Sequence, residues 1–340
     1  MSIISRDQNS GIETADEREM VALAEAALAD IARVRESVGR VIFGQEAVIE
    51  RSLVAILAGG HALLVGVPGL AKTKLVDTLG ITLGLLTRRV QFTPDLMPSD
   101  ILGSEVMEQD ENGRRSFRFI PGPIFAQLLM ADEINRASPR TQSALLQAMQ
   151  EYHVTVAGQR YDLPAPFHVL ATQNPLEQEG TYPLPEAQLD RFLMQVDVLY
   201  PEREAERRIL LETTGVGEAR AKQVMTPERL REIQHLIRRM PVPESVVEAI
   251  LDLVRSARPG NGLADIDRNV SWGPGPRASQ ALTLCARARA LYDGRLAPSI
   301  DDVRALAEPV LQHRMALTFA ARAEGIRVRD VIAGLVERLG

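Results

Sequence analysis

Apolar positions in the first 200 residues follow two alternating patterns. Short, continuous apolar runs predict strands of a parallel sheet, because such strands are buried on both faces. Strands are expected at Ala62–Val65, Arg88–Phe92, Leu128–Ala131, Phe167–Ala171 and Leu193–Leu199. Apolar residues at helical spacing predict amphipathic helices between them, at Glu17–Val38, Glu46–Ala58, Lys72–Leu86, Arg140–Gln150 and Leu184–Phe192. This alternation is typical of an α/β domain.

Four other segments carry different patterns. Met1–Asp16 is polar and predicts a loose tail. Alternating polar and apolar residues around turns predict two β-hairpins, one within Thr93–Pro123 with its second arm at Ser116–Ile120, and one at Tyr152–Asp162. Gly122–Phe125 predicts the beginning of a further helical segment.

Beyond Tyr200 the strand pattern stops. Helical segments separated by Pro and Gly are predicted at Glu202–Thr213, Pro227–Arg238, Pro243–Arg258, Pro276–Asp293, Ile300–Thr318 and Val328–Leu339. The change predicts a domain boundary near Tyr200. The expected division is an N-terminal tail and helix (residues 1–38), an α/β domain with inserted hairpins (39–200) and a helical domain (201–340).

Composition narrows the function classes. With 340 residues, 45% apolar and 25% charged, the chain has the composition and length of a globular protein of two domains. A net charge of −6 and 4% aromatics argue against nucleic-acid binding, although a local basic pore stays compatible with them. Cys285, the single cysteine, excludes an intrachain disulfide and a cysteine-cluster metal site, and the five histidines lack metal-ligand spacing.

No apolar run approaches the length of a membrane span, and the polar N-terminus shows no secretory signal. The predicted compartment is therefore the cytoplasm.

The first chemical signal is Gly66-Val-Pro-Gly-Leu-Ala-Lys-Thr73, between a predicted strand and a predicted helix. A glycine-rich turn points backbone N–H groups at phosphate oxygens, and the helix N-terminus adds partial positive charge. In the pattern G-x-x-x-x-G-K-[ST], Lys72 would reach the β- and γ-phosphates and the Thr73 hydroxyl would ligate Mg²⁺. Ala71 stands in place of the second Gly, so a turn that carries Lys-Thr by chance is the competing interpretation.

The second signal is Asp132-Glu133, which ends an apolar strand. In nucleotide hydrolases the first acid holds Mg²⁺ and the second polarises the attacking water. A buried strand that ends in a solvated acidic turn is the alternative, and the phosphate loop in the same chain disfavours it.

Three weaker signals have equally ordinary interpretations. Asn174 follows a strand and could hydrogen-bond the water or the γ-phosphate, but an Asn before Pro is also a common turn residue. Arg191 could form a salt bridge with Asp190 or a neighbour. The segment Val41-Ile-Phe-Gly-Gln45 could clamp an adenine ring or simply connect two helices.

Four ordered motifs together resemble the MoxR family of AAA+ ATPases of bacteria and archaea: the phosphate loop, Ala131–Ala137, Ala171–Pro175 and Leu184–Phe192. The likeness extends from about Gly39 to the C-terminus. The family commonly carries Ala where Ala71 stands, so this residue does not argue against a phosphate loop. The resemblance implies an α/β P-loop NTPase (AAA+) core with a parallel sheet, followed by an all-α lid domain.

The resemblance also implies a role for the residues of the first two motifs. Lys72 serves the nucleotide, Thr73 and Asp132 serve Mg²⁺, and Glu133 is the catalytic base. The expected nucleotide-binding residues are Val41, Ile42, Gly44, Gln45, Gly66, Val67, Pro68, Gly69, Leu70, Ala71, Lys72, Thr73 and Lys74.

Three further residues match catalytic positions of the family. Asn174 matches the first sensor, and Arg191 matches the arginine finger that reaches the nucleotide of the adjacent subunit. Arg277 matches the second sensor on the lid, acting in cis or in trans. The family more usually shows Ser where Gly275 stands.

By this resemblance the chain is expected to use ATP and Mg²⁺ and to form a homo-oligomeric ring, a hexamer. The ring is expected to remodel a client protein through its hairpins. Family members often work with a separately encoded partner that contains a von Willebrand factor A domain, and no such domain is visible in this chain.

Two alternatives to this function stay open. One is a nucleic-acid motor or clamp, which salt-sensitive DNA binding would favour. The other is a nucleotide-switched scaffold with slow turnover, whereas partner-stimulated hydrolysis would favour the remodeller.

Overall fold

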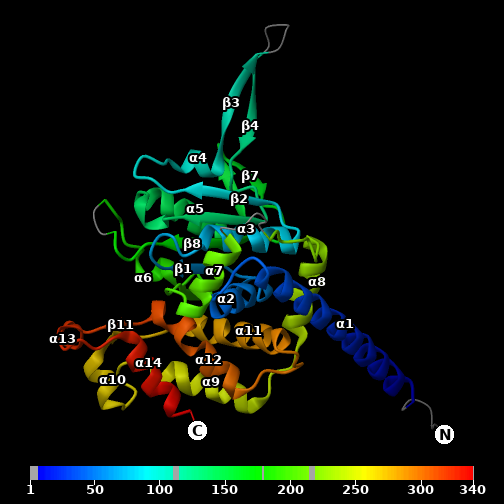
Figure 1. Cartoon of the computed structure of the whole chain (residues 1–340), viewed down its shortest axis with the longest axis vertical. Helices are drawn as coiled ribbons and strands as arrows, with labels where there is room; N and C mark the ends of the chain where they lie inside the picture. Colours follow the sequence, from blue (N-terminus) through cyan, green and yellow to red (C-terminus); the bar gives the residue numbers. More distant parts are fainter. Residues whose placement is uncertain (1–6, 110–114, 178–179, 214–218, 340) are drawn as a thin grey trace.

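The computed structural model describes residues 7–109, 115–177, 180–213 and 219–339 (Figure 1). A five-stranded parallel sheet lies at its centre, in the order β2-β5-β8-β1-β9. The strands are β1 (Ala62–Val65), β2 (Thr87–Gln91), β5 (Leu128–Asp132), β8 (His168–Gln173) and β9 (Met194–Asp197). Because the strands are parallel, their carboxyl ends meet at one edge of the sheet and their amino ends at the other.

The two faces of the sheet face different parts of the molecule. Side chains alternate along each strand, so Leu63 and Leu64 point to opposite faces and belong to two separate apolar clusters. The Leu63 cluster is closed by α4 (Pro98–Leu102) and α5 (Pro139–Glu151). The Leu64 cluster includes the helices on the other face, which are α1 (Asp7–Gly39), α2 (Glu46–Leu57), α3 (Lys72–Leu83) and most of the C-terminal helices.

The C-terminal region is helical, as the sequence predicts. Its elements are α7 (Arg203–Thr213), α8 (Pro227–Arg239), α9 (Glu244–Ser256), α10 (Ala264–Asn269), α11 (Pro276–Tyr292), α12 (Ile300–Leu311), η2 (Gln312–Arg314), α13 (Phe319–Ala323) and α14 (Val328–Glu337). A buried ion cluster fixes it to the core: Asp302, which has no exposed surface, accepts from Arg289 at 2.6 Å, and Arg289 also donates to Glu50 of α2 at 2.9 Å.

Both predicted hairpins are present. The first pairs β3 (Gly103–Gln109) with β4 (Arg115–Pro121), and the second pairs β6 (His153–Val156) with β7 (Gln159–Asp162). Figure 1 shows the first hairpin projecting well beyond the sheet. Phe119 at its base stacks on Tyr161 of the second hairpin, with ring centroids 3.9 Å apart. Farther out, the Phe117 side chain is exposed.

Three sequence predictions are wrong. Residues 7–16 are helical rather than a loose tail, because they continue α1 and helix extension adds one backbone hydrogen bond for each residue that is fixed. Residues 122–125 form turns instead of a helix, since the Phe125 N–H donates to the Gly122 carbonyl. The lid is not entirely helical either: α12 ends at Leu311, and β11 (Ala316–Leu317) pairs with β10 (Val270–Trp272).

Candidate nucleotide-binding site

The phosphate loop begins where β1 ends at the carboxyl edge of the sheet. The Gly66 N–H donates to the Gln173 carbonyl at 3.1 Å. A Cβ on Gly66 would lie 2.6 Å from the Val198 carbonyl oxygen, so only glycine fits there. Gly69 has a φ of +84°, and the chain then turns into α3 at Lys72. The two glycines therefore permit the short, tight turn that phosphate binding needs.

The backbone conformation of Ala71 explains why the general pattern has a glycine at this position. It is the N-cap of α3 and has φ +56° and ψ +20°, in the left-handed region that suits glycine. An alanine can occupy this region at a cost of about 1 kcal/mol. The departure from the pattern is thus a strained but feasible residue in an otherwise intact loop.

A cavity of about 460 Å³ lies above this loop, and we call it the phosphate-loop cavity. It collects side chains from the loop, from α3 and from the carboxyl ends of three strands. Its lining residues are Pro68, Gly69, Leu70, Ala71, Lys72, Thr73, Lys74, Arg89, Gln91, Asp132, Glu133, Thr172 and Asn174. The structure therefore brings together the residues predicted for phosphate, Mg²⁺, base and first sensor.

Lys72 points back along the loop. Its Nζ donates to the Gly66 carbonyl and, at 2.9 Å, to the Val67 carbonyl. Gly66 and Val67 thus act through their backbone and do not line the cavity. Burial lowers the pKa of Lys72, while Asp132 and Glu133 counteract that shift. The two acids therefore favour the ammonium form, which is the form that binds phosphate.

Asp132 is buried and already holds a cation. One carboxylate oxygen accepts from the Thr172 hydroxyl at 2.5 Å, and the other accepts from Arg89 Nη2 at 2.5 Å. Arg89, Asp132 and Thr73 all line the phosphate-loop cavity. A buried carboxylate beside a hydroxyl, paired with a cation, is a donor set that fits Mg²⁺.

Glu133 has a strained backbone and two partners. Its φ of +55° is unusual for a residue with a side chain, and such strain concentrates at functional sites. Gln91 Nε2 donates to its carboxylate at 2.7 Å, and Arg136 Nη1 donates to the same oxygen at 3.0 Å. Both bonds end on Oε2, so they fix the orientation of the carboxylate and compete with water for that oxygen.

Asn174 lies in the cavity lining and also caps a turn. It is buried and lines the phosphate-loop cavity. Its Oδ1 also accepts from the Leu176 N–H at 3.1 Å, which is the turn role.

A smaller apolar cavity of about 110 Å³ adjoins the loop. It shares Gly69, Leu70, Ala71 and Lys74 with the phosphate-loop cavity and is otherwise lined by Val41, Ile42, Phe43, Gln45, Pro201 and Ile209. Gly44 does not line it, but a Cβ there would lie 2.2 Å from Ala205 Cβ, so glycine permits the close approach of α7. An apolar slot beside a phosphate loop suits a flat purine ring.

Arg191 and Arg277 line a different cavity, of about 250 Å³, which we call the arginine cavity. It lies at the amino edge of the sheet, since His61 precedes β1 and Leu193 precedes β9. Among the described residues, none lines both this cavity and the phosphate-loop cavity. The structure therefore places the two predicted arginines together and away from the phosphate loop.

Asp190 does not pair with Arg191, contrary to the ordinary interpretation of the sequence. Its carboxylate accepts from Arg314 Nε at 2.7 Å and lies 3.8 Å from Arg277 Nη1. Within the described residues the Arg191 side chain forms no salt bridge, so it is available for an anion.

Sequence reasoning missed several residues of the phosphate-loop region. Arg89 and Gln91 are two residues apart on β2, so their side chains share a face of the sheet. This spacing could have predicted that both reach the same site. Thr172 follows the apolar part of β8 in the same way. Arg136 carries no such signal, because a turn brings its side chain back to Glu133.

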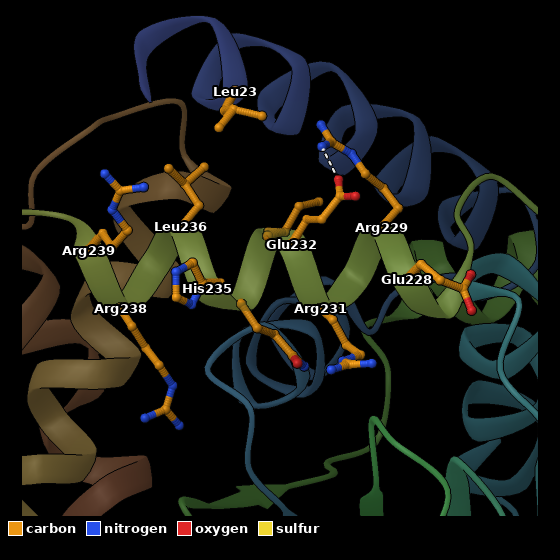
Figure 2. Close-up of a pocket in the computed structure, with 11 residues that line it drawn as sticks. Leu23, Glu228, Arg229, Arg231, Glu232, His235, Leu236, Arg238 and Arg239 are labelled. Atoms are coloured by element: carbon orange, nitrogen blue, oxygen red, sulfur yellow. Dashed lines mark hydrogen bonds and ion pairs between the residues drawn. The ribbon is translucent and has the colours of Figure 1, made fainter. Parts of the chain in front are cut away.

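A further cavity, of about 590 Å³, shares Arg238 with the arginine cavity and no residue with the phosphate-loop cavity. It lies between α1 and α8 and is lined by Leu23 and residues of α8 (Figure 2). We call it the α1–α8 groove. In the part of the chain that the structure describes, three or more His, Cys, Asp or Glu side chains never gather as a metal-binding group, and no helix is long and apolar enough to cross a membrane.

Two family models match the chain. Residues 61–194 match the ATPase family associated with various cellular activities (AAA), and residues 264–335 match the AAA lid domain. The first segment holds the phosphate loop, Asp132, Glu133, Asn174 and Arg191, and the second holds Arg277.

Relatives extend this likeness over most of the chain. The chain is 43% identical to the chaperone MoxR1 of Mycobacterium tuberculosis, over 87% of this chain and 78% of that protein. It is 34% identical to the protein MoxR of Methylorubrum extorquens, over 84% and 87% respectively. The crystal structure of an ATPase candidate from Cytophaga hutchinsonii superposes with a TM-score of 0.87 at 38% identity, covering 97% of this chain and 98% of the other.

Proposed function

This chain belongs to the MoxR family of AAA+ ATPases, and we propose that it converts ATP and water to ADP and phosphate at a site completed by a neighbouring copy. The observation that carries this proposal is the placement of two complementary half-sites. The phosphate-loop cavity holds the loop and the acids at the carboxyl edge of the sheet, and the arginine cavity holds Arg191 and Arg277 at the amino edge.

Each residue of the phosphate-loop cavity has a role in this proposal. The loop N–H groups and Lys72 bind the phosphates, and the apolar cavity at Val41 and Ile42 takes the adenine ring. Bound Mg²⁺, held by Thr73 and Asp132, would neutralise charge on the phosphates. Glu133 accepts a proton from the attacking water while Asn174 orients that water. The proton goes to the Glu133 carboxylate as the new P–O bond forms and the bond to the ADP oxygen breaks.

The arginines act in trans. β1 has four residues and spans about 13 Å at 3.3 Å per residue, so a side chain at the amino edge is too far from the phosphates at the carboxyl edge of its own sheet. A head-to-tail contact between identical copies brings the amino edge of one against the carboxyl edge of the next, and such contacts close into rings. This geometry supports trans action for Arg277 as well as for Arg191.

The ring is proposed to be a hexamer that remodels a client protein, together with a separate partner carrying a von Willebrand factor A domain. A division near Tyr200 would let the lid move against the core during turnover. The exposed β3–β4 hairpin, with Phe117 on its surface, is the element best placed to contact a client.

A nucleotide-switched scaffold is the second candidate. Arg89 pairs with Asp132, and Gln91 and Arg136 both donate to the Glu133 carboxylate. This arrangement favours slow basal turnover. Hydrolysis that no client, partner or assembly stimulates would favour the scaffold over the remodeller.

Mixing two inactive variants tests the shared site. Arg191→Ala should still bind ATP but hydrolyse it poorly, because fingers of this kind contribute factors of about 10³–10⁵. Glu133→Gln should be inactive because it lacks the base, although it still supplies an intact Arg191 to the adjacent subunit. Co-assembled rings of the two should regain activity, because some junctions pair an intact Glu133 with an intact Arg191. No recovery in demonstrated co-assemblies would contradict action in trans.

A further inference from the structure

The arginine cavity carries more positive charge than the two family motifs account for. Its ionisable lining contains four arginines, Arg191, Arg238, Arg277 and Arg314, against a single acid, Asp190. Burial lowers the pKa of His61 to about 3, so this histidine is neutral at pH 7. A surplus of cations in a chain with a formal charge of −6 marks this cavity as unusual.

Arg314 and Asp190 neutralise each other and leave three cations. Arg314 is 2% exposed and donates to Asp190 at 2.7 Å. Its other donors bond the carbonyls of Phe192, Leu193 and Val310. Arg314 is therefore a structural residue whose donors are all used inside the protein. The surplus belongs to Arg191, Arg277 and Arg238, and no carboxylate of the described residues lies within 4 Å of Arg238.

Arg238 is held in place by the preceding turn of α8. Gln234 donates from Nε2 to the Ile56 carbonyl at 2.8 Å and to His168 Nε2 at 3.0 Å. His168 Nδ1 in turn bonds the Gly60 carbonyl at 2.8 Å. These buried contacts fix α8 against the amino edge of the sheet. The Arg238 Nη2 atom then lies 3.6 Å from the position that a Cβ on Gly59 would occupy, on the wall of the cavity.

Arg238 and its neighbour Arg239 point in opposite directions. Figure 2 shows Arg239 on the side of α8 that faces α1 and Arg238 on the opposite side, and both residues line the α1–α8 groove. Both lie in the last turn of α8, where a cation is favoured by the helix dipole. Helix stability alone would therefore explain either arginine equally, but only Arg238 reaches the arginine cavity.

We infer that Arg238 is a third phosphate-binding arginine, which contacts the terminal phosphate of the ATP held by the neighbouring subunit. This inference rests on the proposed shared site. A terminal phosphate carries three oxygens and concentrated negative charge, so it can accept hydrogen bonds from several guanidinium groups at once. Arg238 sits on the lid, as Arg277 does, and so couples α8 as well as α11 to the presence of ATP in the adjacent copy.

The test compares Arg238→Ala with Arg239→Ala, which removes the same charge from the same helix turn. At a protein concentration where light scattering shows equal assembly, Arg238→Ala should reduce kcat roughly 10- to 100-fold, the effect of losing one charged hydrogen bond. Arg239→Ala should stay within about twofold of the unmodified protein. Arg238→Lys, which keeps the charge but not the paired donors, should fall between them and serves if the alanine variant does not assemble.

Mixing experiments separate action in trans from a local defect. In a one-to-one mixture of Arg238→Ala with Glu133→Gln, about one junction in four pairs an intact Glu133 with an intact Arg238 if subunits assemble at random. Activity should rise above that of either variant alone. No rise in co-assembled rings, or equal rates for Arg238→Ala and Arg239→Ala, would overturn the inference.

The control for the underlying proposal is Arg191→Ala in the same assay. If Arg191→Ala loses activity while Arg238→Ala does not, only the role of Arg238 is wrong. If Arg191→Ala and Arg277→Ala also keep full activity in assembled protein, the shared site itself is wrong.

Discussion

The phosphate-loop cavity and the arginine cavity differ in how their charges are balanced. In the first, Lys72 donates to loop carbonyls and Arg89 pairs with Asp132, while Arg136, outside the cavity lining, pairs with Glu133. In the second, Arg191 and Arg238 have no carboxylate partner among the described residues. The cations of the first cavity are therefore balanced within the subunit, whereas the second cavity presents guanidinium donors without a carboxylate partner, and such donors bind anions well.

The surroundings of the arginine cavity fit this difference. Three buried histidines lie at or next to it: His61 in its lining, His168 against Gly60, and His313 beside Arg314. Burial lowers the pKa of His61 to about 3 and that of His168 to about 4, and it lowers the pKa of His313 well below its usual range. Neutral histidines add no positive charge to the arginine cavity, where the arginines already outnumber the acids.

The largest expected effect distinguishes binding from hydrolysis. Lys72→Ala should weaken ATP binding by roughly 10- to 100-fold, because a charged hydrogen bond to phosphate is lost, and hydrolysis should disappear at ordinary ATP concentrations. Arg191→Ala should leave the ATP dissociation constant of the isolated subunit unchanged. Calorimetric titration of both variants checks this contrast. A weakened dissociation constant for Arg191→Ala at dilution would place Arg191 in the site of its own subunit.

The next effect concerns acid. A buried neutral histidine binds its proton only in the unfolded chain, so stability is full above pH 6.5 and falls as pH drops from 6.5 toward about 4, by about 1.4 kcal/mol per pH unit for each histidine. Between pH 6.5 and 5 the free energy of unfolding should therefore fall steeply. His168→Gln keeps a donor and an acceptor and should give a shallower slope, measured by urea unfolding. An unchanged slope would mean that His168 does not remain neutral in the folded protein.

A smaller effect is expected from releasing Glu133. Gln91→Ala removes one of the two donors to the same carboxylate oxygen and should raise the basal ATPase rate by roughly two- to tenfold. Arg88→Ala, on the same strand but outside the cavity lining, is the matched control. A lower rate for Gln91→Ala than for the control would show that Gln91 positions Glu133 productively.

The smallest effect concerns strain in the phosphate loop. Ala71→Gly should raise the free energy of unfolding by about 0.5–1 kcal/mol, because relief of the left-handed backbone exceeds the extra entropy of the unfolded glycine chain. Ala157→Gly, at φ +50° in the hairpin turn, should give a similar gain. Differential scanning calorimetry measures both, and a loss of stability for Ala71→Gly would contradict the assigned strain.

Local sequence predicted the phosphate-loop cavity well because its parts are local. A strand, a glycine turn and Lys72-Thr73 are contiguous, and Asp132 and Asn174 come at strand ends that a parallel sheet brings to one edge. The hairpin at Tyr152–Asp162 was also predictable from alternation around its turn. Arg89 and Gln91 were missed because polar residues on an edge strand are normally solvated.

The arginine cavity could not be predicted in the same way. Arg191, Arg238 and Arg277 come from three separate segments, and they meet only because α8 and α11 pack against the amino edge of the sheet. Family resemblance supplied Arg191 and Arg277 one by one, without placing them together. Arg238 next to Arg239 gives no signal, since both look like ordinary cations at a helix end.

The shared site is tested most directly by ATPase rate per subunit across a protein-concentration series, with light-scattering mass recorded at each concentration. The account predicts that the rate per subunit rises in step with the assembled fraction and vanishes in Glu133→Gln. A constant rate per subunit that persists where the protein is monomeric would contradict it, because a single copy would then hydrolyse ATP without its neighbour's arginines.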